Sequence, residues 1–293
     1  MDRVLLARFP SSTRAFCRQA VEGAQVRVNG RPCLKGDKLR PNDSVTVVTL
    51  KEACDNRVRP DPAVPLQIVF EDAHLVAANK PAGMAVHPLS SEETGTLMNG
   101  LVARYPELAE LGDQPLMAGA LHRIDTGTSG LVLAARTPAA FEALRAQFDA
   151  QQVEKIYLAL VEGHVAVPGR LVHELAHHPS HPCCKMVDAR SLAAPDRRMR
   201  AETAYRPLEL VGPDTLLEVT IHTGVTHQIR CQLALGGMPI VNDPLYGAKP
   251  VAGCARHFLH AYEARFRHPA SGLPCCLQAP LADDFRAYLE RLS

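Results

Sequence analysis

Apolar residues recur along this chain at two periods, one typical of helices and the other typical of strands. From about residue 64 onward the two patterns follow one another without a regular alternation of strand and helix. An irregular order of this kind favours an α+β domain built around a mixed, largely antiparallel sheet.

Three apolar or alternating stretches predict strands, at residues 131–135, 155–161 and 217–221. In the second stretch one face carries Ile156, Leu158 and Leu160, and the opposite face carries Lys155, Tyr157 and Ala159. The alternation therefore predicts that Tyr157 faces away from the apolar stripe.

Helical spacing appears after two threonines. Thr137 is a predicted N-cap with Pro138 in the first turn, and the core positions that follow are Phe141, Leu144 and Phe148. Thr226 is the predicted cap of a later helix, which carries His227 and Arg230 on one face and ends at Gly236.

The first 50 residues predict a small unit of their own. Ser11 and Ser12 offer a cap for a helix over residues 14–21, which would present Arg14 and Arg18 on one face. Asn29-Gly30 predicts a hairpin turn, and residues 39–48 predict a turn into a closing strand. We expect this small α/β unit at residues 1–50, a proline-containing linker at 51–63 and the main domain at 64–293.

The N-terminal 50 residues differ in charge from the rest of the chain, which the small overall net charge conceals. The chain has a formal net charge of +1, but residues 1–50 hold nine Lys and Arg against four Asp and Glu. A basic segment on an otherwise slightly acidic chain suggests a polyanionic partner for that segment.

Composition bounds the class of protein. Hydrophobic residues make up 46% of the 293 positions and charged residues 22%, as in globular proteins. The apolar run near the start is too short for a signal peptide, and no run approaches the length of a membrane span. Nine cysteines without a framework spacing suit a reducing compartment, so we expect a cytoplasmic protein.

The run from His122 to Gly130 has the composition of a functional site. Asp125 lies two residues after Arg123, in a segment of hydroxyls and glycines that ends at a predicted strand. Cationic neighbours favour an ionised carboxylate, and Gly127 and Gly130 let the backbone approach a ligand. We expect Asp125 on a loop that the following strand holds rigidly.

Two other motifs give alternative hypotheses. Residues 125–129 resemble the D-T-G-T-S signature of aspartic proteases, but those enzymes pair two such loops and this chain has one. Residues 173–177 satisfy the zinc motif H-E-x-x-H, with further His and Cys nearby at 178, 181, 183 and 184. Glycine and prolines close to both ends argue against the long helix that this motif needs, so we predict no metal site.

The whole run from 122 to 131 resembles the H-R-L-D-x-x-T-S-G-L motif of pseudouridine synthases of the large-subunit ribosomal RNA type, with Ile124 in place of Leu. Four further segments resemble motifs of the same family in the expected order: residues 79–88, 155–161, 223–230 and 243–247, the last followed by Leu259-His260-Ala261. The N-terminal unit is similar to a small RNA-binding domain found in a ribosomal protein and some tRNA synthetases. In that family the segment around 173–177 corresponds to a variable surface loop.

This resemblance implies an enzyme that isomerises uridine to pseudouridine in RNA without a cofactor. It implies that Asp125 is the catalytic carboxylate that attacks or stabilises the detached sugar or base, that Arg230 pairs with it, and that Tyr157 packs against the target base and is a candidate for removing its proton. The residues expected to contact RNA are Arg123, His122, Lys80, His227, Arg14 and Arg18. The expected partner is large-subunit ribosomal RNA, with transfer RNA as the alternative, and the chain is expected to be a monomer away from membranes.

Two positions depart from the family pattern. Val225 stands where Arg is usual, so a phosphate contact is missing or is supplied by Lys185 or Arg198, and Asn242 replaces a usual Gly. The alternative function is an RNA-binding or ribosome-assembly factor that has the same fold and no activity. The presence of Asp125, Tyr157 and Arg230 argues against that alternative.

Overall fold

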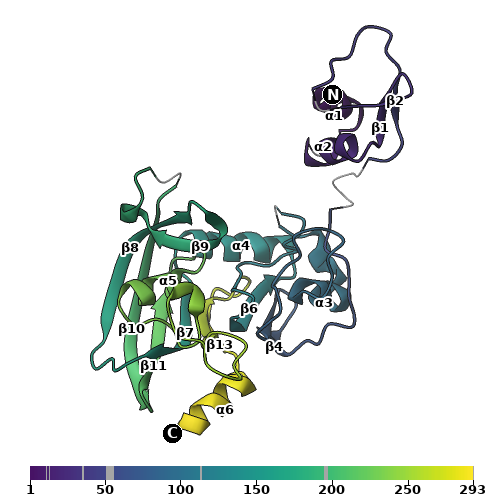
Figure 1. Ribbon diagram of the computed structural model, residues 1–293. Helices are drawn as coiled ribbons and strands as arrows, with labels where there is room; N and C mark the ends of the chain where they lie inside the picture. The colour runs from purple at the N-terminus through teal and green to yellow at the C-terminus, as the bar shows by residue number, and fades with distance from the viewer. Residues whose placement is uncertain are drawn as a thin grey trace.

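Figure 1 shows the computed structural model, which describes residues 1–293 except 11, 13, 35, 51–55, 113, 195–196 and 293. The helices, with short 3₁₀ turns labelled η, are α1 (Asp2–Arg8), α2 (Arg14–Glu22), α3 (Leu97–Arg104), η2 (Pro106–Glu110), α4 (Pro138–Asp149), η3 (Ala189–Ser191), α5 (Gln228–Leu235), η4 (Pro244–Tyr246) and α6 (Asp283–Leu292). The strands are β1 (Val26–Val28), β2 (Arg31–Pro32), β3 (Val45–Val47), β4 (Ile68–Glu71), β5 (Leu75–Lys80), β6 (Ser129–Ala135), β7 (Glu154–Glu162), β8 (Gly169–His178), β9 (His181–Asp188), β10 (Met199–Val211), β11 (Asp214–Ile221), β12 (Leu259–Arg267) and β13 (Pro274–Gln278).

The N-terminal unit, purple in Figure 1, packs two helices on a small antiparallel sheet of order β2-β1-β3. The turn between β1 and β2 has positive φ at both Asn29 and Gly30, which is the hairpin geometry that this dipeptide predicts. The predicted helix is confirmed as α2, whose inner face buries Phe16, Cys17, Ala20 and Val21. Arg14 and Arg18 lie on its exposed face as predicted, and the predicted cap residue Ser11 lies outside the described residues.

In the described part of the chain, ten strands form one large sheet. Its order is β4-β5-β6-β12-β7-β11-β10-β8-β9, and β13 pairs with β12 beside this path. β12 runs parallel to β6, and the other described pairs are antiparallel. The predicted α+β class with a mixed, largely antiparallel sheet is thus confirmed.

β12 joins two groups of strands that are far apart in the sequence. On one side of it lie β4, β5 and β6, and on the other lie β7, β11, β10, β8 and β9 (Figure 1). At the parallel junction Gly130 has φ +115°, and a Cβ there would lie 2.2 Å from the carbonyl oxygen of Ala261. Only glycine fits this contact, because both the backbone angle and the space exclude a side chain.

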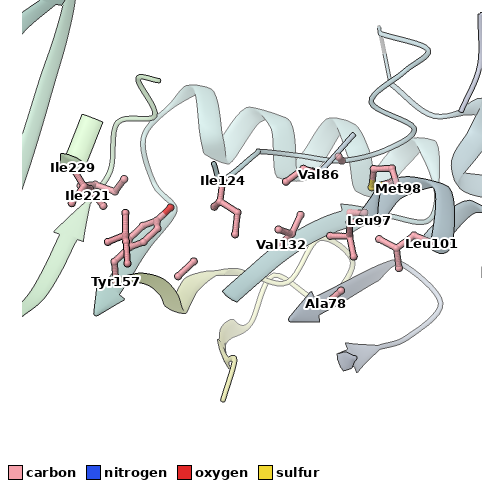
Figure 2. Close-up of a cluster of buried hydrophobic side chains, with 14 of the residues drawn as sticks. Ala78, Val86, Leu97, Met98, Leu101, Ile124, Val132, Tyr157, Ile221 and Ile229 are labelled. Carbon is pink, nitrogen blue, oxygen red and sulfur yellow. The ribbon is translucent and has the colours of Figure 1, made fainter. Parts of the chain in front are cut away.

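β7 is buried on both faces. The prediction that the face opposite Leu158 and Leu160 carries Tyr157 is confirmed. Ala159 and Val161 share its face and belong with it to the largest hydrophobic cluster, part of which Figure 2 shows. The other face carries Leu160, which packs in a second cluster with Phe258 and with Phe285 of α6. Alternation within 155–161 therefore separates two cores rather than a core from solvent, because elements from the C-terminal third cover the second face.

Helix α4 matches its prediction closely. The Thr137 hydroxyl accepts a hydrogen bond from the backbone N–H of Ala140, and Pro138 opens the helix. Leu144 is buried in a hydrophobic cluster with residues of β5 and β6, and Phe141 and Phe148 pack against that cluster.

One predicted boundary and one predicted loop differ in the structure. Val58 is 3% exposed and belongs to the largest cluster, the Asn99 side chain donates to the carbonyl of Arg59, and Asp61 accepts from the backbone of Gly95. The main domain therefore begins before residue 64, within the segment predicted as a linker, whose residues 51–55 lie outside the described residues. The segment predicted as a surface loop at 173–177 is instead part of strand β8.

Among the described residues, no helix is long and apolar enough to cross a membrane.

Candidate active site

Asp125 lies on a tight turn that leads directly into β6. The backbone N–H of Thr128 donates to the carbonyl of Asp125, and that of Gly83 donates to the carbonyl of Thr126. Gly127 lies against His257, where a Cβ would come within 2.9 Å of the imidazole carbon Cε1. The carboxylate is therefore held by packing on both sides of its turn, as its place before a buried strand predicts.

Arg230 joins Asp125 to a second carboxylate. Its Nη1 donates to Oδ2 of Asp125 at 2.8 Å, while Nε and Nη2 donate to the two oxygens of Asp243 at 2.7 and 2.9 Å. Burial alone would lower the pKa of Arg230, but the hydrogen bonds and charges of Asp243 and Asp125 outweigh it and raise the pKa. This arrangement separates the two carboxylates by a cation, whereas aspartic proteases let two carboxylates share one proton.

Helix α5 presents Arg230 from its first turn, and it begins one residue later than the prediction. Its N-cap is His227, in the left-handed conformation at φ 51°, and Thr226 does not cap it. The side chain of Gln228 instead accepts hydrogen bonds from the backbone of Val225 and the hydroxyl of Thr223. This unusual start brings His227 Nε2 within 3.7 Å of Asp125 Oδ2.

Tyr157 lies in the apolar wall near Asp125. It is 7% exposed, and Figure 2 shows its ring beside Ile221 and Ile229, with Ile124 on its other side. Burial, and then the charge of Asp125, raise the pKa of Tyr157 above its usual value, so the phenol stays protonated at neutral pH.

Besides lying near Asp125, His227 contacts Tyr246. Its Nδ1 lies 3.1 Å from the hydroxyl of Tyr246, whose ring in turn packs under the guanidinium of Arg230 at 5.2 Å. Burial lowers the pKa of His227, and the charge of Asp125 opposes that shift.

Lys80, one of the residues predicted to contact RNA, has another role in the structure. Lys80 is fully buried, and its ammonium donates to the carbonyls of Pro81, Met84 and Thr126. Because Thr126 follows Asp125 directly, Lys80 helps to hold the Asp125 turn in place. Burial lowers its pKa to about 7, against the charge of Asp125. Direct contact of Lys80 with RNA is incompatible with this burial.

His122 is half-buried and lines the cleft, and contacts within the fold hold its ring in place. Its Nε2 accepts a hydrogen bond from the backbone of Leu133, and its ring stacks on Phe148 with centroids 5.3 Å apart. Burial, with the nearby charge of Lys155, lowers its pKa to about 3. His122 is therefore neutral at physiological pH and supplies no positive charge to Asp125 or to a phosphate.

A cleft of about 1530 Å³ opens over Asp125, Tyr157 and Arg230. Among the described residues, seven cationic side chains line it, namely Arg123, Arg145, Lys155, Arg197, Arg200, Arg230 and Arg256, against the carboxylates of Glu93, Asp125, Asp149 and Asp243. Because Arg230 already pairs with two of these carboxylates, the cleft offers a surplus of positive charge to a polyanion.

The position of Val225 can now be assessed. Val225 packs against a small cluster that includes Met199 and Tyr246. Arg198 pairs with Glu174 and Lys185 lies over the Tyr246 ring, and neither of them lines the cleft. Arg197 and Arg200 do line the cleft, so they are candidates for a phosphate contact in place of the Arg that is usual at position 225.

Sequence reasoning missed Asp243 and His257. Asp243 is 1% exposed and holds Arg230. The feature that could have identified it is its place at the start of the family motif at residues 243–247. His257 lies 2.9 Å from the Thr128 hydroxyl and packs on Gly127. No local pattern marks it, because it reaches the turn from a loop 130 positions later.

Asn242 precedes Asp243 in the left-handed conformation, at φ 61°. Its side chain donates to the carbonyls of Cys254 and Arg256 and accepts from the backbone of Val251. These contacts explain how a non-glycine residue is accommodated here.

The H-E-x-x-H motif does not have the geometry of a zinc site. In the extended strand β8, His173 and His177 lie roughly 13 Å apart along the chain rather than one helical turn apart. His173 Nδ1 is also 3.0 Å from the side-chain amide of Gln232. Within the described ranges no three His, Cys, Asp or Glu side chains gather as metal ligands, and the side chains of Cys183 and Cys184 lie outside the described residues.

Comparisons with known proteins agree with this geometry. Residues 74–235 match the family described as RNA pseudouridylate synthase, and residues 2–45 match the S4 domain. Ribosomal large subunit pseudouridine synthase D of Xanthomonas campestris pv. campestris is 34% identical, covering 99% of this chain and 88% of that protein. An uncharacterized RNA pseudouridine synthase of Chloroflexus aurantiacus is 38% identical, covering 100% of this chain and 89% of that protein.

A solved structure shares the fold. Human RNA pseudouridylate synthase domain containing 1 superposes with a TM-score of 0.61 at 24% identity, covering 78% of this chain and 90% of that chain. The matched residues and the full-length relatives together show that this chain belongs to the RNA pseudouridylate synthase family and is an RNA-modifying isomerase with an N-terminal S4 domain.

Proposed function

We propose that the enzyme isomerises specific uridines in structured large-subunit ribosomal RNA, with Asp125 as the reacting carboxylate. The observation that carries this proposal is the bridge from Asp243 through Arg230 to Asp125, at the floor of a cationic cleft and close to Tyr157. A fixed carboxylate beside an apolar wall suits a reaction in which an uncharged base is detached and turned in place.

In the proposed reaction the bond between ribose C1′ and uracil N1 breaks, the uracil turns, and C1′ bonds to C5. The C5 proton leaves, and N1 takes up a proton, so the product has the same composition as the substrate. Asp125 attacks the substrate and is released again when the new bond between C1′ and C5 has formed. Arg230 donates a hydrogen bond to Asp125 and thereby fixes its orientation toward the cleft.

Tyr157 has the position of a packing surface for the uracil. Its neighbours Ile221 and Ile229 extend that surface with apolar side chains. Because its phenol is protonated, Tyr157 can take the C5 proton only as it gives up its own. A Tyr157→Phe variant separates the two roles, since the ring is kept and the oxygen is lost.

The target nucleotide has to leave its stack to reach Asp125, at a cost of roughly a few kcal/mol. Arg123 is exposed at the mouth of the cleft, where its Nη2 donates to the Thr226 hydroxyl at 3.3 Å. We propose that this guanidinium enters the space that the flipped base leaves or grips a neighbouring phosphate.

The choice of ribosomal RNA rests on relatives and on charge. Several relatives at 31–34% identity are named as large-subunit synthases, and the S4 domain carries the basic surplus of the chain. We propose an active monomer, and we place it in the cytoplasm, where its proposed substrate is made.

Tritium release from ribosomal RNA labelled at uracil C5 tests the proposal. Unmodified large-subunit RNA is incubated with the protein and with its Asp125→Ala variant. Release by the first and none by the second is expected. No release from ribosomal RNA, with release from transfer RNA, would change the substrate. No release from either, with RNA binding retained, would support the inactive-factor alternative.

A further inference from the structure

Lys155 is a buried cation that the proposed reaction leaves unused. It is 7% exposed, and no carboxylate pairs with it in the described part of the chain. Within the described ranges its ammonium donates one hydrogen bond, to the carbonyl of Thr223 at 2.8 Å. An ammonium with three donors and one neutral acceptor is incompletely compensated, which is costly in a buried position.

The side chain is fixed at the wall of the cleft. Thr223 holds its Nζ from one side, the ring of Phe148 lies 5.7 Å from it on another, and a Cβ on Gly224 would stand 3.6 Å away. All of these residues line the cleft. Burial lowers the pKa of Lys155 to about 8, which still leaves it largely protonated at neutral pH.

Lys155 also has a defined place relative to Tyr157. The two residues are i and i+2 on β7, so their side chains leave the same face of the strand roughly 7 Å apart. If a uracil lies over Tyr157, the Lys155 ammonium is too far along the cleft wall to contact the uracil ring. It is instead close to the part of the nucleotide to which the uracil is attached. In RNA that attachment is the sugar–phosphate backbone.

We propose that the Lys155 ammonium binds a phosphate oxygen of the strand that carries the flipped uridine. This inference rests on the proposed function, because it takes the uridine to lie over Tyr157. Lys155 is then a positioning residue, which anchors the backbone while the base turns. A phosphate supplies the negative charge that the protein does not, whereas a uracil carbonyl would add a second neutral acceptor.

The salt dependence of binding tests this contact. Each phosphate that a protein neutralises adds roughly 0.7 to 0.9 to the slope of log affinity against log salt concentration. The affinity of wild-type protein, Lys155→Met and Lys249→Met for a stem-loop RNA with a uridine-rich loop is measured from low to moderate salt. Lys249 is exposed and outside the cleft, so its variant is a matched control for the loss of one charge.

We expect Lys155→Met to lower the slope by close to one unit and to weaken binding about ten-fold or more at low salt. Lys249→Met should leave both nearly unchanged. In turnover, KM for RNA should rise more than kcat falls. Thermal melting of each variant establishes that it is folded, and Lys155→Gln serves as a second variant if Lys155→Met is not.

An unchanged slope in a folded Lys155 variant would overturn the proposal, as would an equal fall in Lys249→Met. A loss of kcat without any loss of slope would mean that Lys155 acts on the base. Absence of wild-type binding at low salt would also overturn it. The proposed reaction is judged separately by tritium release, which the binding measurement does not use.

Discussion

Asp243 holds Arg230 through two hydrogen bonds of 2.7 and 2.9 Å, and both side chains are almost fully buried. The pair is therefore a structural anchor as well as part of the site. Breaking a buried ion pair from one side leaves a charge without its partner.

Asp243→Ala should destabilise the protein by roughly 3–5 kcal/mol and also reduce turnover, because Arg230 loses its fixed orientation. Urea unfolding measures the first effect and tritium release the second. A folded Asp243→Ala variant with full activity would show that Arg230 needs no anchor.

Asp125→Asn should abolish turnover at little cost in stability. Asp125 is partly exposed, and Arg230 keeps its two bonds to Asp243 when Asp125 changes. We expect RNA affinity within several-fold of wild type and a melting temperature close to it. Measurable turnover by this variant would remove Asp125 from its proposed role.

Gly130→Ala should destabilise the protein by roughly 3 kcal/mol or more, because the added methyl group meets the backbone of Ala261 and φ is positive. Gly237→Ala is the matched control. It has a similar positive φ of 77° but nothing within 4 Å of the new Cβ, so roughly 1–2 kcal/mol is expected. Equal losses in the two variants would mean that the β6–β12 junction can open to admit a methyl group.

Acid should destabilise the protein below pH 6.5. Burial lowers the pKa values of His257 and His260 to about 4, so both remain neutral in the folded state while the unfolded chain takes up protons. The free energy of unfolding therefore keeps its full value, as far as these two residues decide it, above pH 6.5. It falls progressively toward pH 4, by roughly 3 kcal/mol for each residue. Urea unfolding across this range should show a smaller loss in a His260→Gln variant than in wild type, and an equal loss would contradict the assignment.

Removing residues 1–50 should weaken RNA binding and flatten its salt dependence, because this unit holds nine Lys and Arg against four Asp and Glu whereas the rest of the chain has a net negative charge. An Arg14→Gln, Arg18→Gln double variant tests the exposed face of α2 without deleting the domain. An unchanged salt slope in the deletion would show that the basic unit does not contact this RNA.

Local patterns predicted local structure well. The Asn29-Gly30 hairpin, the Thr137 cap of α4 and the strand at 131–135 each depend on residues within a few positions. Their physical causes, which are turn geometry, capping and alternation, act over that same range.

The sequence was less informative where distant segments meet. The burial of Lys80 depends on carbonyls up to Thr126, and the second core behind Tyr157 depends on α6. His257 reaches the Asp125 turn from across the sheet. The start of α5 was misplaced because His227 adopts a left-handed conformation that a non-glycine residue seldom takes. The roles of Asp125, Tyr157 and Arg230 came from the family resemblance, and the structure shows that Asp125 and Arg230 meet.

The central position of β12 has a consequence for how the protein is made. β12 is synthesised after β4 to β11, yet it lies between β6 and β7. A nascent chain that ends before residue 259 therefore has two separate groups of strands, with the turn of Asp125 on one and Tyr157 on the other. Closing this gap needs contacts between residues more than a hundred positions apart, which form slowly. A copy emerging from a ribosome thus cannot assemble the candidate site until β12 has been made and has paired with both β6 and β7.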